Sequence, residues 1–140
     1  MPQVLALIAA ISFGIGTYFE KQGLHLGGLS PQMGLALRTV TSALILSVIT
    51  WSQWRTLPRV EPKAIAMIVL GGGVLVGAFG LLCFYAALKG APLTKVMPIA
   101  FTSPLFGALM AITFGGEHLT WQTGVGMLLT VGGIVVLTIK

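Results

Sequence analysis

The sequence predicts an all-α integral membrane protein with five transmembrane helices. Hydrophobic residues make up 56% of the 140 residues and charged residues only 8%, whereas an ordinary soluble domain carries about 25% charged residues. The few charges lie almost entirely between five apolar stretches. A bilayer core of ~30 Å needs about 20 residues of helix, and each stretch is close to that length. The expected helices are residues 2–19, 31–50, 64–85, 96–114 and 121–139 of one membrane domain, 1–140.

The first two helices are separated by a loop with clear boundary signals. Gly23, Gly27 and Gly28 follow the first apolar stretch, and we expect them to end its helix. Ser30 followed by Pro31 is typical of a helix N-cap with proline at the first helical position. The second helix is therefore expected to begin at residue 31.

Small residues recur at helical spacing in the third and fourth stretches. Gly73, Gly77 and Gly80 follow one another in the third, and Ser103 and Gly107 are four residues apart in the fourth. Helices in lipid gain much of their packing from such close approach of backbones. We expect these five positions to be helix-packing sites.

Two prolines interrupt the fourth stretch. Proline removes a backbone hydrogen bond from a helix interior and bends it, so Pro98 and Pro104 predict a kink. Backbone carbonyls freed by a kink survive in a membrane only beside protein or a water-filled cavity. The kink is therefore either a gating bend in a cavity wall or purely structural.

The basic residues indicate contact with lipid and not with nucleic acid. The net charge is +5, but the basic residues are distributed over different loops, whereas a nucleic-acid surface needs them clustered. Lysine and arginine at helix ends commonly meet lipid headgroups. Trp51, Trp54 and Trp121 fall on the same side of the predicted membrane, as expected of an aromatic belt.

The composition argues against an enzyme. The chain has two histidines, one cysteine (Cys83), three glutamates and no aspartate. These residues show neither metal-ligand spacing nor a nucleophile next to a base. We expect no cofactor and no metal.

Arg38 is the charged residue that lies clearly inside an apolar stretch. It stands seven residues into its helix, about 10 Å of rise. Its side chain either extends to the nearby headgroups or points inward, where it pairs with Glu20 or meets an anionic group of a substrate. Glu20, at the end of the first helix, is either a solvated interfacial carboxylate or a proton site.

Hydroxyl and aromatic side chains provide the other candidate polar contacts at depth. Thr41 and Ser42 share a helix face with Arg38, and Phe13 shares one with Thr17 and Glu20. The expected substrate-contacting residues are Phe13, Thr17, Arg38, Thr41, Ser42, Tyr85 and Thr102.

The order of several short motifs resembles a known family of transporters. The motifs are FYAAL at 84–88, VMP at 96–98, GEHLT at 116–120 and WQTG at 121–124, after Ser30-Pro31 and Arg38. Together they resemble a single EamA domain of the drug/metabolite transporter superfamily. The resemblance implies a permease in the inner or plasma membrane that moves a small metabolite or amphipathic molecule by alternating access.

The same resemblance implies a second half. Most members of that family carry two such domains, related as inverted repeats around a central path, and inverted repeats place the substrate site at their interface. We therefore expect an antiparallel homodimer. The alternatives are a flippase for lipid-linked metabolites and a non-transporting subunit of a larger membrane assembly.

The distribution of positive charge fits insertion in both orientations. Arg55, Arg59 and Lys63 lie on the N-terminal side of the predicted membrane. Four lysines lie on the other side, namely Lys21, Lys89, Lys95 and Lys140. Positive residues normally concentrate on the cytoplasmic side, and here the bias is nearly absent. Dual topology is thus one expectation, with a small preference for an external N-terminus.

The small multidrug resistance proteins, distant relatives of that family, resemble residues 14–17 and the segment on to Lys21. Their proton-coupling glutamate would fall at Phe13. Because a phenylalanine stands there, we do not expect export of cationic drugs through a central carboxylate. We expect Phe13 to line an apolar passage.

Overall fold

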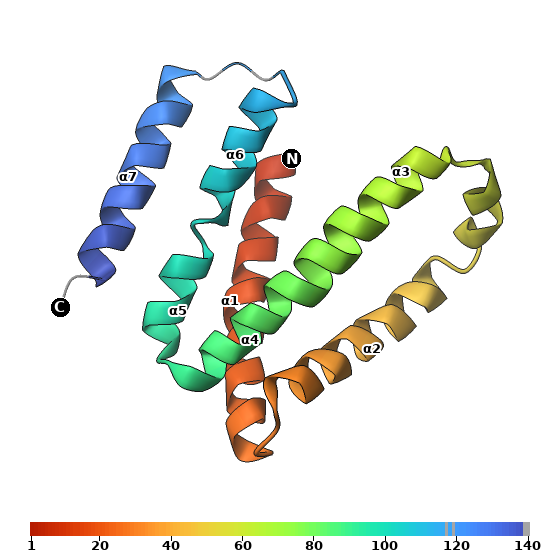
Figure 1. Ribbon diagram of the computed structural model, residues 1–140, viewed down its shortest axis with the longest axis horizontal. Coiled ribbons are helices and arrows are strands. Elements are labelled where there is room, and N and C mark those ends of the chain that lie inside the picture. The colour runs from red at the N-terminus through yellow and green to blue at the C-terminus, as the bar shows by residue number, and fades with distance from the viewer. Residues whose placement is uncertain (117, 119, 139–140) are drawn as a thin grey trace. The chain divides into compact units, whose positions relative to one another are not determined.

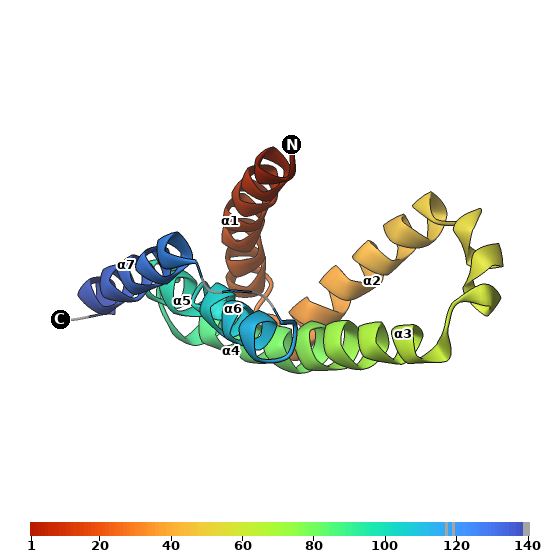
Figure 2. The ribbon, with the colours of Figure 1, turned by 90° about the horizontal axis from the view of Figure 1, so that it is seen from above.

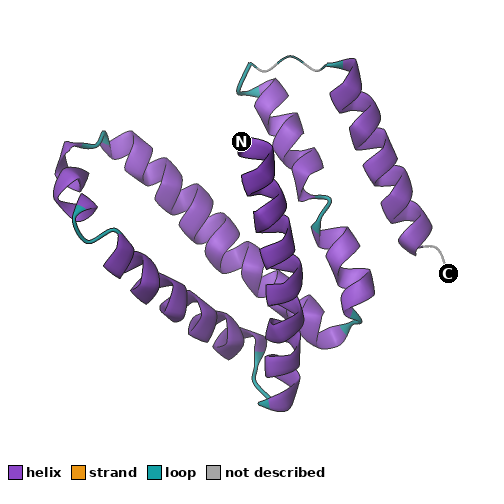
Figure 3. Ribbon diagram, turned by 180° about the vertical axis from the view of Figure 1, so that it is seen from behind, coloured by secondary structure: helices purple, strands orange, loops and turns teal. Residues whose placement is uncertain are grey.

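The computed structural model describes residues 1–116, 118 and 120–138, and these residues form helices joined by short loops (Figure 1). Colouring by secondary structure shows no strand in this described part of the chain (Figure 3). The chain divides into two compact units, Met1–Gly90 and Ala91–Lys140. The predicted all-helical class is therefore confirmed for the described residues.

The first unit contains three long helical segments and one short connecting helix. The third segment is continuous but changes its helical type twice. The elements are α1 (Pro2–Leu26), α2 (Pro31–Ile49), the 3-10 helix η1 (Gln53–Arg59), α3 (Pro62–Met67), the π-helix η2 (Ile68–Gly80) and α4 (Leu81–Gly90).

The first helix is longer than the sequence predicted. It passes through Gly23 and ends at Leu26, with Gly28 in the left-handed region at φ 58°. The Leu29 amide donates to the Leu24 carbonyl over 3.1 Å, and the Gly28 amide donates to the His25 carbonyl over 3.3 Å. These two bonds form a Schellman C-terminal motif. The predicted end near residue 19 was wrong because a glycine inside a helix costs only about 1 kcal/mol, which burial of Leu24 outweighs.

The start of the second helix was predicted correctly. Ser30 has extended backbone angles, and its hydroxyl accepts a hydrogen bond from the Met33 amide over 3.2 Å. Pro31 occupies the first turn, where its missing N–H leaves no intrahelical bond unmade. The loop of residues 27–30 therefore returns the chain sharply from α1 to α2.

The glycines of the third segment have a local role in the π-helix. A Cβ at Gly77 would lie 3.0 Å from the Gly72 carbonyl oxygen, and one at Gly80 would lie 3.3 Å from that of Leu75. Each of these carbonyls is five residues earlier in the same helix, which is the π-helical spacing. A Cβ at Gly73 would meet nothing within 4 Å. Packing of this face against another helix stays a prediction.

The second unit contains the predicted kink. A turn at residues 101–102 separates two helices, with Pro98 inside the first and Pro104 in the first turn of the second. The Thr102 amide and hydroxyl both donate to the Ile99 carbonyl, over 3.1 and 2.8 Å. The helix is therefore interrupted between the two prolines, and a gating role for this break stays a prediction. The helices are α5 (Leu93–Ala100), α6 (Ser103–Thr113) and α7 (Trp121–Thr138), of which α5 and α7 pack together.

Among the described residues, four helical segments are long and apolar enough to cross a bilayer. A fifth apolar helix, Trp121–Leu137, is shorter, and residue 139 of its predicted range lies outside the described residues. The protein is a multi-pass membrane protein, and five complete crossings stay a prediction. The four segments are Pro2–Leu26, Pro31–Ile49, Pro62–Gly90 and Leu93–Thr113.

Candidate functional site

Three helices of the first unit meet at one end. The C-terminal half of α1 and the N-terminal half of α2 both pack against α4, close to the 27–30 loop (Figures 1 and 2). Side chains from all three helices are buried there, and we call this region the helix junction. Its buried hydrophobic side chains are Leu24, Leu35, Tyr85 and Leu88, of which Leu24 and Tyr85 are 2% exposed and Leu88 is fully buried.

An ion pair lies at the helix junction. Arg38 Nε is 2.9 Å from Glu20 Oε1, with 36% and 24% of the two side chains exposed. Glu20 is six residues before the end of α1 and Arg38 is seven after the start of α2. Both therefore stand about 10 Å of helix rise below the connecting loop. Of the two orientations predicted for Arg38, the structure shows the inward one, paired with Glu20.

Tyr85 joins the ion pair from the third helix. Its hydroxyl lies within electrostatic reach of both the Glu20 carboxylate and the Arg38 guanidinium. Because its ring is almost fully buried, the position of this hydroxyl is fixed by packing. One acid, one base and one phenol thus converge from α1, α2 and α4.

A glycine allows these helices to approach. A Cβ placed on Gly34 would collide with the Cδ2 atom of Leu24 and lie 3.2 Å from the ring of Tyr85. Gly34 is on α2 one turn before Arg38, so its lack of a side chain determines how closely α2 meets α1 and α4. The distance between Arg38 and Glu20 depends on this contact.

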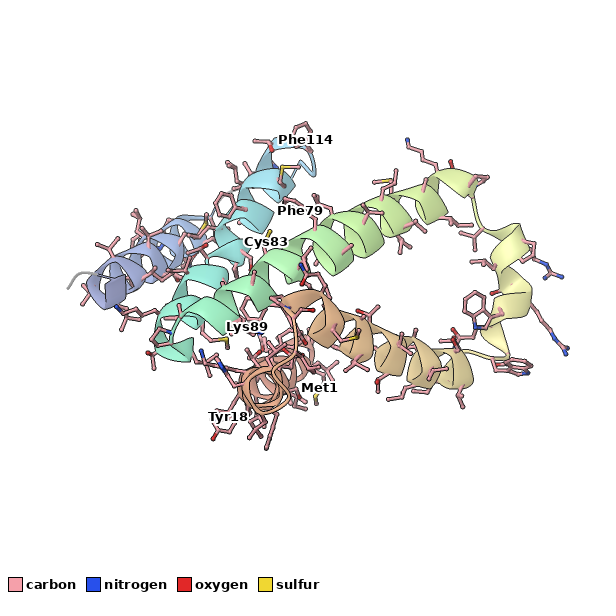
Figure 4. The ribbon with its side chains drawn as sticks, turned by 60° about the horizontal axis from the view of Figure 1, so that its bottom comes forward. Met1, Tyr18, Phe79, Cys83, Lys89 and Phe114 are labelled. Atoms are coloured by element: carbon pink, nitrogen blue, oxygen red, sulfur yellow. The ribbon has the colours of Figure 1, made fainter. Side chains whose placement is uncertain are left out.

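Two lysines connect the helix ends around the site. The Lys21 ammonium donates to the Leu88 carbonyl over 2.8 Å, and the Lys89 ammonium donates to the Leu29 carbonyl. Leu88 lies in the last turn of α4, where carbonyls lack intrahelical partners and a positive charge is favourable. Lys89 is labelled in Figure 4, at the end of α4.

Three of the predicted substrate-contacting residues come together at the helix junction. Arg38 and Tyr85 both face Glu20, and Thr17 is buried one turn before Glu20 on α1. Their proximity is an observation, whereas contact of these residues with a substrate stays a prediction.

Of the other four, the three that belong to the first unit lie outside the helix junction. Phe13 is 55% exposed on α1, and the Thr41 hydroxyl bonds back to the Leu37 carbonyl of its own helix over 2.9 Å. Ser42 is exposed on α2, and Thr102 belongs to the second unit. Whether these residues contact a substrate stays a prediction too.

Sequence reasoning missed the residues that support the ion pair, namely Lys21, Leu24, Gly34 and Lys89. A signal for two of them was present, because residues 17, 20, 21 and 24 follow the i, i+3, i+4, i+7 spacing of one helix face. This stripe is the face of α1 that carries Thr17, Glu20 and Leu24. The signal for Gly34 was obscured by the 18 other glycines of the chain.

Other possible sites are weak. Among the described residues, no three His, Cys, Asp or Glu side chains are grouped as metal ligands would be. A shallow depression lies at the C-terminal end of α2, lined by Ser47, Trp51, Trp54 and Arg55. The helix junction is therefore the better candidate, because it combines charge, burial and convergence of three helices.

Comparisons with known proteins agree with the membrane fold. Residues 1–139 match the model of the EamA-like transporter family. An uncharacterized protein of Methanocaldococcus jannaschii is 26% identical over 137 residues, which cover 98% of this chain and 96% of that protein. No solved structure matches the chain.

Proposed function

Since this chain belongs to the EamA-like transporter family of the drug/metabolite transporter superfamily, we propose that it is a small-molecule permease that works by alternating access as a dimer. Its family makes it a membrane transporter. The finer proposal is that one chain provides a single EamA-like domain of five spans, and that a second copy in the opposite orientation provides the other half. Such pairing places a substrate path at the interface of the two halves.

The observation that carries this proposal is the Glu20–Arg38 pair. Charged groups inside membrane spans are costly and usually mark substrate or ion pathways. Here the pair is held at a defined depth by three helices, and a part of each side chain is still exposed. We propose that Arg38 receives an anionic or zwitterionic group of the substrate, with Tyr85 and Thr17 beside it.

The remaining predicted contacts belong to the same proposal. Phe13, Thr41 and Ser42 lie on exposed parts of α1 and α2, where they are available to a second chain or to a substrate between two chains. The break at residues 101–102 is proposed to be the gating bend.

Transport by purified protein in liposomes tests the proposal. We expect labelled organic anions or zwitterions to enter vesicles that contain the protein, and we expect Arg38→Ala to reduce that flux at least tenfold. Arg59→Lys is the matched control, because it removes a guanidinium from the exposed helix η1 and keeps the positive charge at that position. Wild-type flux through a folded Arg38→Ala variant would exclude Arg38 from the site.

The same preparation distinguishes the two alternatives. Movement of a labelled glycolipid between leaflets, without entry of soluble compounds, would identify a flippase. Recovery of the protein only with a heterologous partner, together with the absence of any flux, would identify an assembly subunit.

A further inference from the structure

The ion pair at the helix junction leaves part of the Arg38 guanidinium available. Arg38 contacts Glu20 through Nε, and guanidinium carries four more N–H donors on its two terminal nitrogens. In the structure 36% of the Arg38 side chain is exposed, so part of it is accessible from outside the helix junction. A planar two-oxygen anion fits such an edge through two parallel hydrogen bonds.

The charge of the pair is already balanced. Glu20 neutralises Arg38, so a carboxylate that arrives from solution would add an unbalanced negative charge to a partly buried, apolar place. A negative charge next to a carboxylate favours the protonated form of that carboxylate. Binding of an anion and binding of a proton are then thermodynamically linked.

We propose that the Glu20–Arg38 pair is a proton-linked binding site for the carboxylate of a substrate, in which Glu20 is the resident counter-ion that the substrate carboxylate replaces. This inference rests on the proposed permease function and adds its substrate class and its coupling ion. The substrate is a carboxylate with an apolar body, because the exposed surface of α1 and α2 beside the two charges is apolar, as at Phe19 and Leu37.

The step conserves atoms and charge. Ionised Glu20, protonated Arg38, the substrate carboxylate and one hydronium ion, whose O–H bond breaks, become neutral Glu20, an Arg38–carboxylate pair and one water molecule. The total charge is zero before and after, and no covalent bond other than the O–H bond of Glu20 is formed. The transported complex is electroneutral, which lowers the cost of moving it through a low-dielectric path.

The other ionisable groups around Glu20 do not prevent the substrate carboxylate from replacing Glu20 at Arg38. From α2 it faces Arg38 and from α4 it faces Tyr85. On its own helix, the neighbouring Lys21 bonds to the Leu88 carbonyl. Lys89, at the end of α4, bonds to the Leu29 carbonyl. Since both lysines have fixed partners, neither replaces Arg38 as the cation of the site.

Calorimetry on the full chain in detergent tests the proposal, with benzoate, hexanoate and octanoate as probes and benzamide as the uncharged control. Titrations at pH 7.5 in two buffers of different ionisation enthalpy give the number of protons taken up. We expect about one proton per bound carboxylate, affinity that rises about tenfold per unit decrease in pH, and no proton uptake with benzamide.

Two substitutions sharpen the test. Glu20→Gln is expected to bind carboxylates at least tenfold more tightly at pH 7.5, with no proton uptake and no dependence on pH. Arg38→Gln is expected to lose carboxylate binding. Glu61→Gln is the matched control, because it removes an exposed glutamate at the start of α3, and it should behave as wild type.

Several results would overturn the proposal. These are carboxylate binding to wild type without proton uptake, a pH dependence that persists in Glu20→Gln, and absence of binding by all three carboxylates. The wild-type titrations decide the question even if Glu20→Gln does not fold. Flux in liposomes that is unchanged by Glu20→Gln would reject the coupling and leave the permease function intact, whereas absence of all flux would reject the permease itself.

Discussion

Gly34 occupies a position at the helix junction where even a methyl group has no room. Its neighbours Leu24 and Tyr85 are both almost completely buried, so a methyl group at Gly34 would require these side chains to shift inside the junction. Because this contact brings α2 to α1 and α4, the glycine stabilises the same arrangement that pairs Arg38 with Glu20.

We expect Gly34→Ala to lower the free energy of unfolding by about 1–3 kcal/mol, because overpacking forces neighbours out of their rotamers. The measurement is thermal unfolding in detergent. Gly14→Ala is the matched control, since a Cβ there meets nothing within 4 Å, and it should be neutral or stabilising by up to about 1 kcal/mol. Equal stability of the two variants would show that the junction relaxes around the methyl group.

Individual residues differed in how far the sequence could predict them. The pairing of Arg38 with Glu20 was one of two predicted orientations, because a short loop places both residues at the same depth. Gly34 could not be singled out, since its role depends on the side chains opposite it on α1 and α4. The position of a residue in the sequence predicts how far along its helix it lies. It does not predict which side chain of a neighbouring helix will contact it.

At the level of helices, the fourth apolar stretch is divided in two. Proline at 104 cannot donate to the Ala100 carbonyl, and the chain makes a turn at residues 101–102 before α6 begins. This break was predictable because proline chemistry acts locally.

We expect Pro104→Ala to restore a donor and extend helix through the break. Amide hydrogen exchange of residues 101–105, followed by mass spectrometry, should then slow by at least about tenfold. If the break is the gating bend, flux in liposomes should fall as well. Pro58→Ala, in η1, is the control and should leave exchange at 101–105 unchanged. Unaltered exchange in Pro104→Ala would show that the break does not depend on Pro104.

Other features of the helices were beyond local rules. The end of α1 was misplaced because burial of Leu24 outweighs the cost of Gly23, and burial depends on the tertiary structure. The π-helix η2 was not predicted either. The spacing of its glycines fits a surface for packing against another helix. In the π-helix, however, a side chain at Gly77 or Gly80 would also crowd the carbonyl five residues earlier. The sequence alone does not show which of these two effects requires glycine.

For the whole molecule, the large exposed apolar surface is explained by the membrane that surrounds the protein. Most large hydrophobic side chains of α1, α2 and η2 are exposed in a single chain, such as Phe79 in Figure 4. In a bilayer this surface meets lipid or a second copy, and the hydrophobic effect does not distinguish the two. Fold class was therefore predictable from composition, whereas the oligomeric state was not.

The antiparallel dimer makes a prediction about membrane topology. On the predicted topology the two sides carry three and four basic residues, and such a small difference should allow both orientations. We expect reporters fused after Lys140 to give signal both in the cytoplasm and outside. Arg59→Gln should shift the C-terminus toward the cytoplasm and Lys95→Gln should shift it outward, because the side that keeps more positive charge stays inside.

Function can then be tied to orientation. Further removal of basic residues from one side of the membrane should force a variant into a single orientation. If two chains of opposite orientation form one substrate path, each such variant should lose most of its flux. Flux should return when the two are produced together, since each provides the half that the other lacks. Full flux from one forced variant alone would reject the antiparallel dimer and would place the complete path in chains of the same orientation. This complementation separates assembly from chemistry, because neither forced variant alters the helix junction.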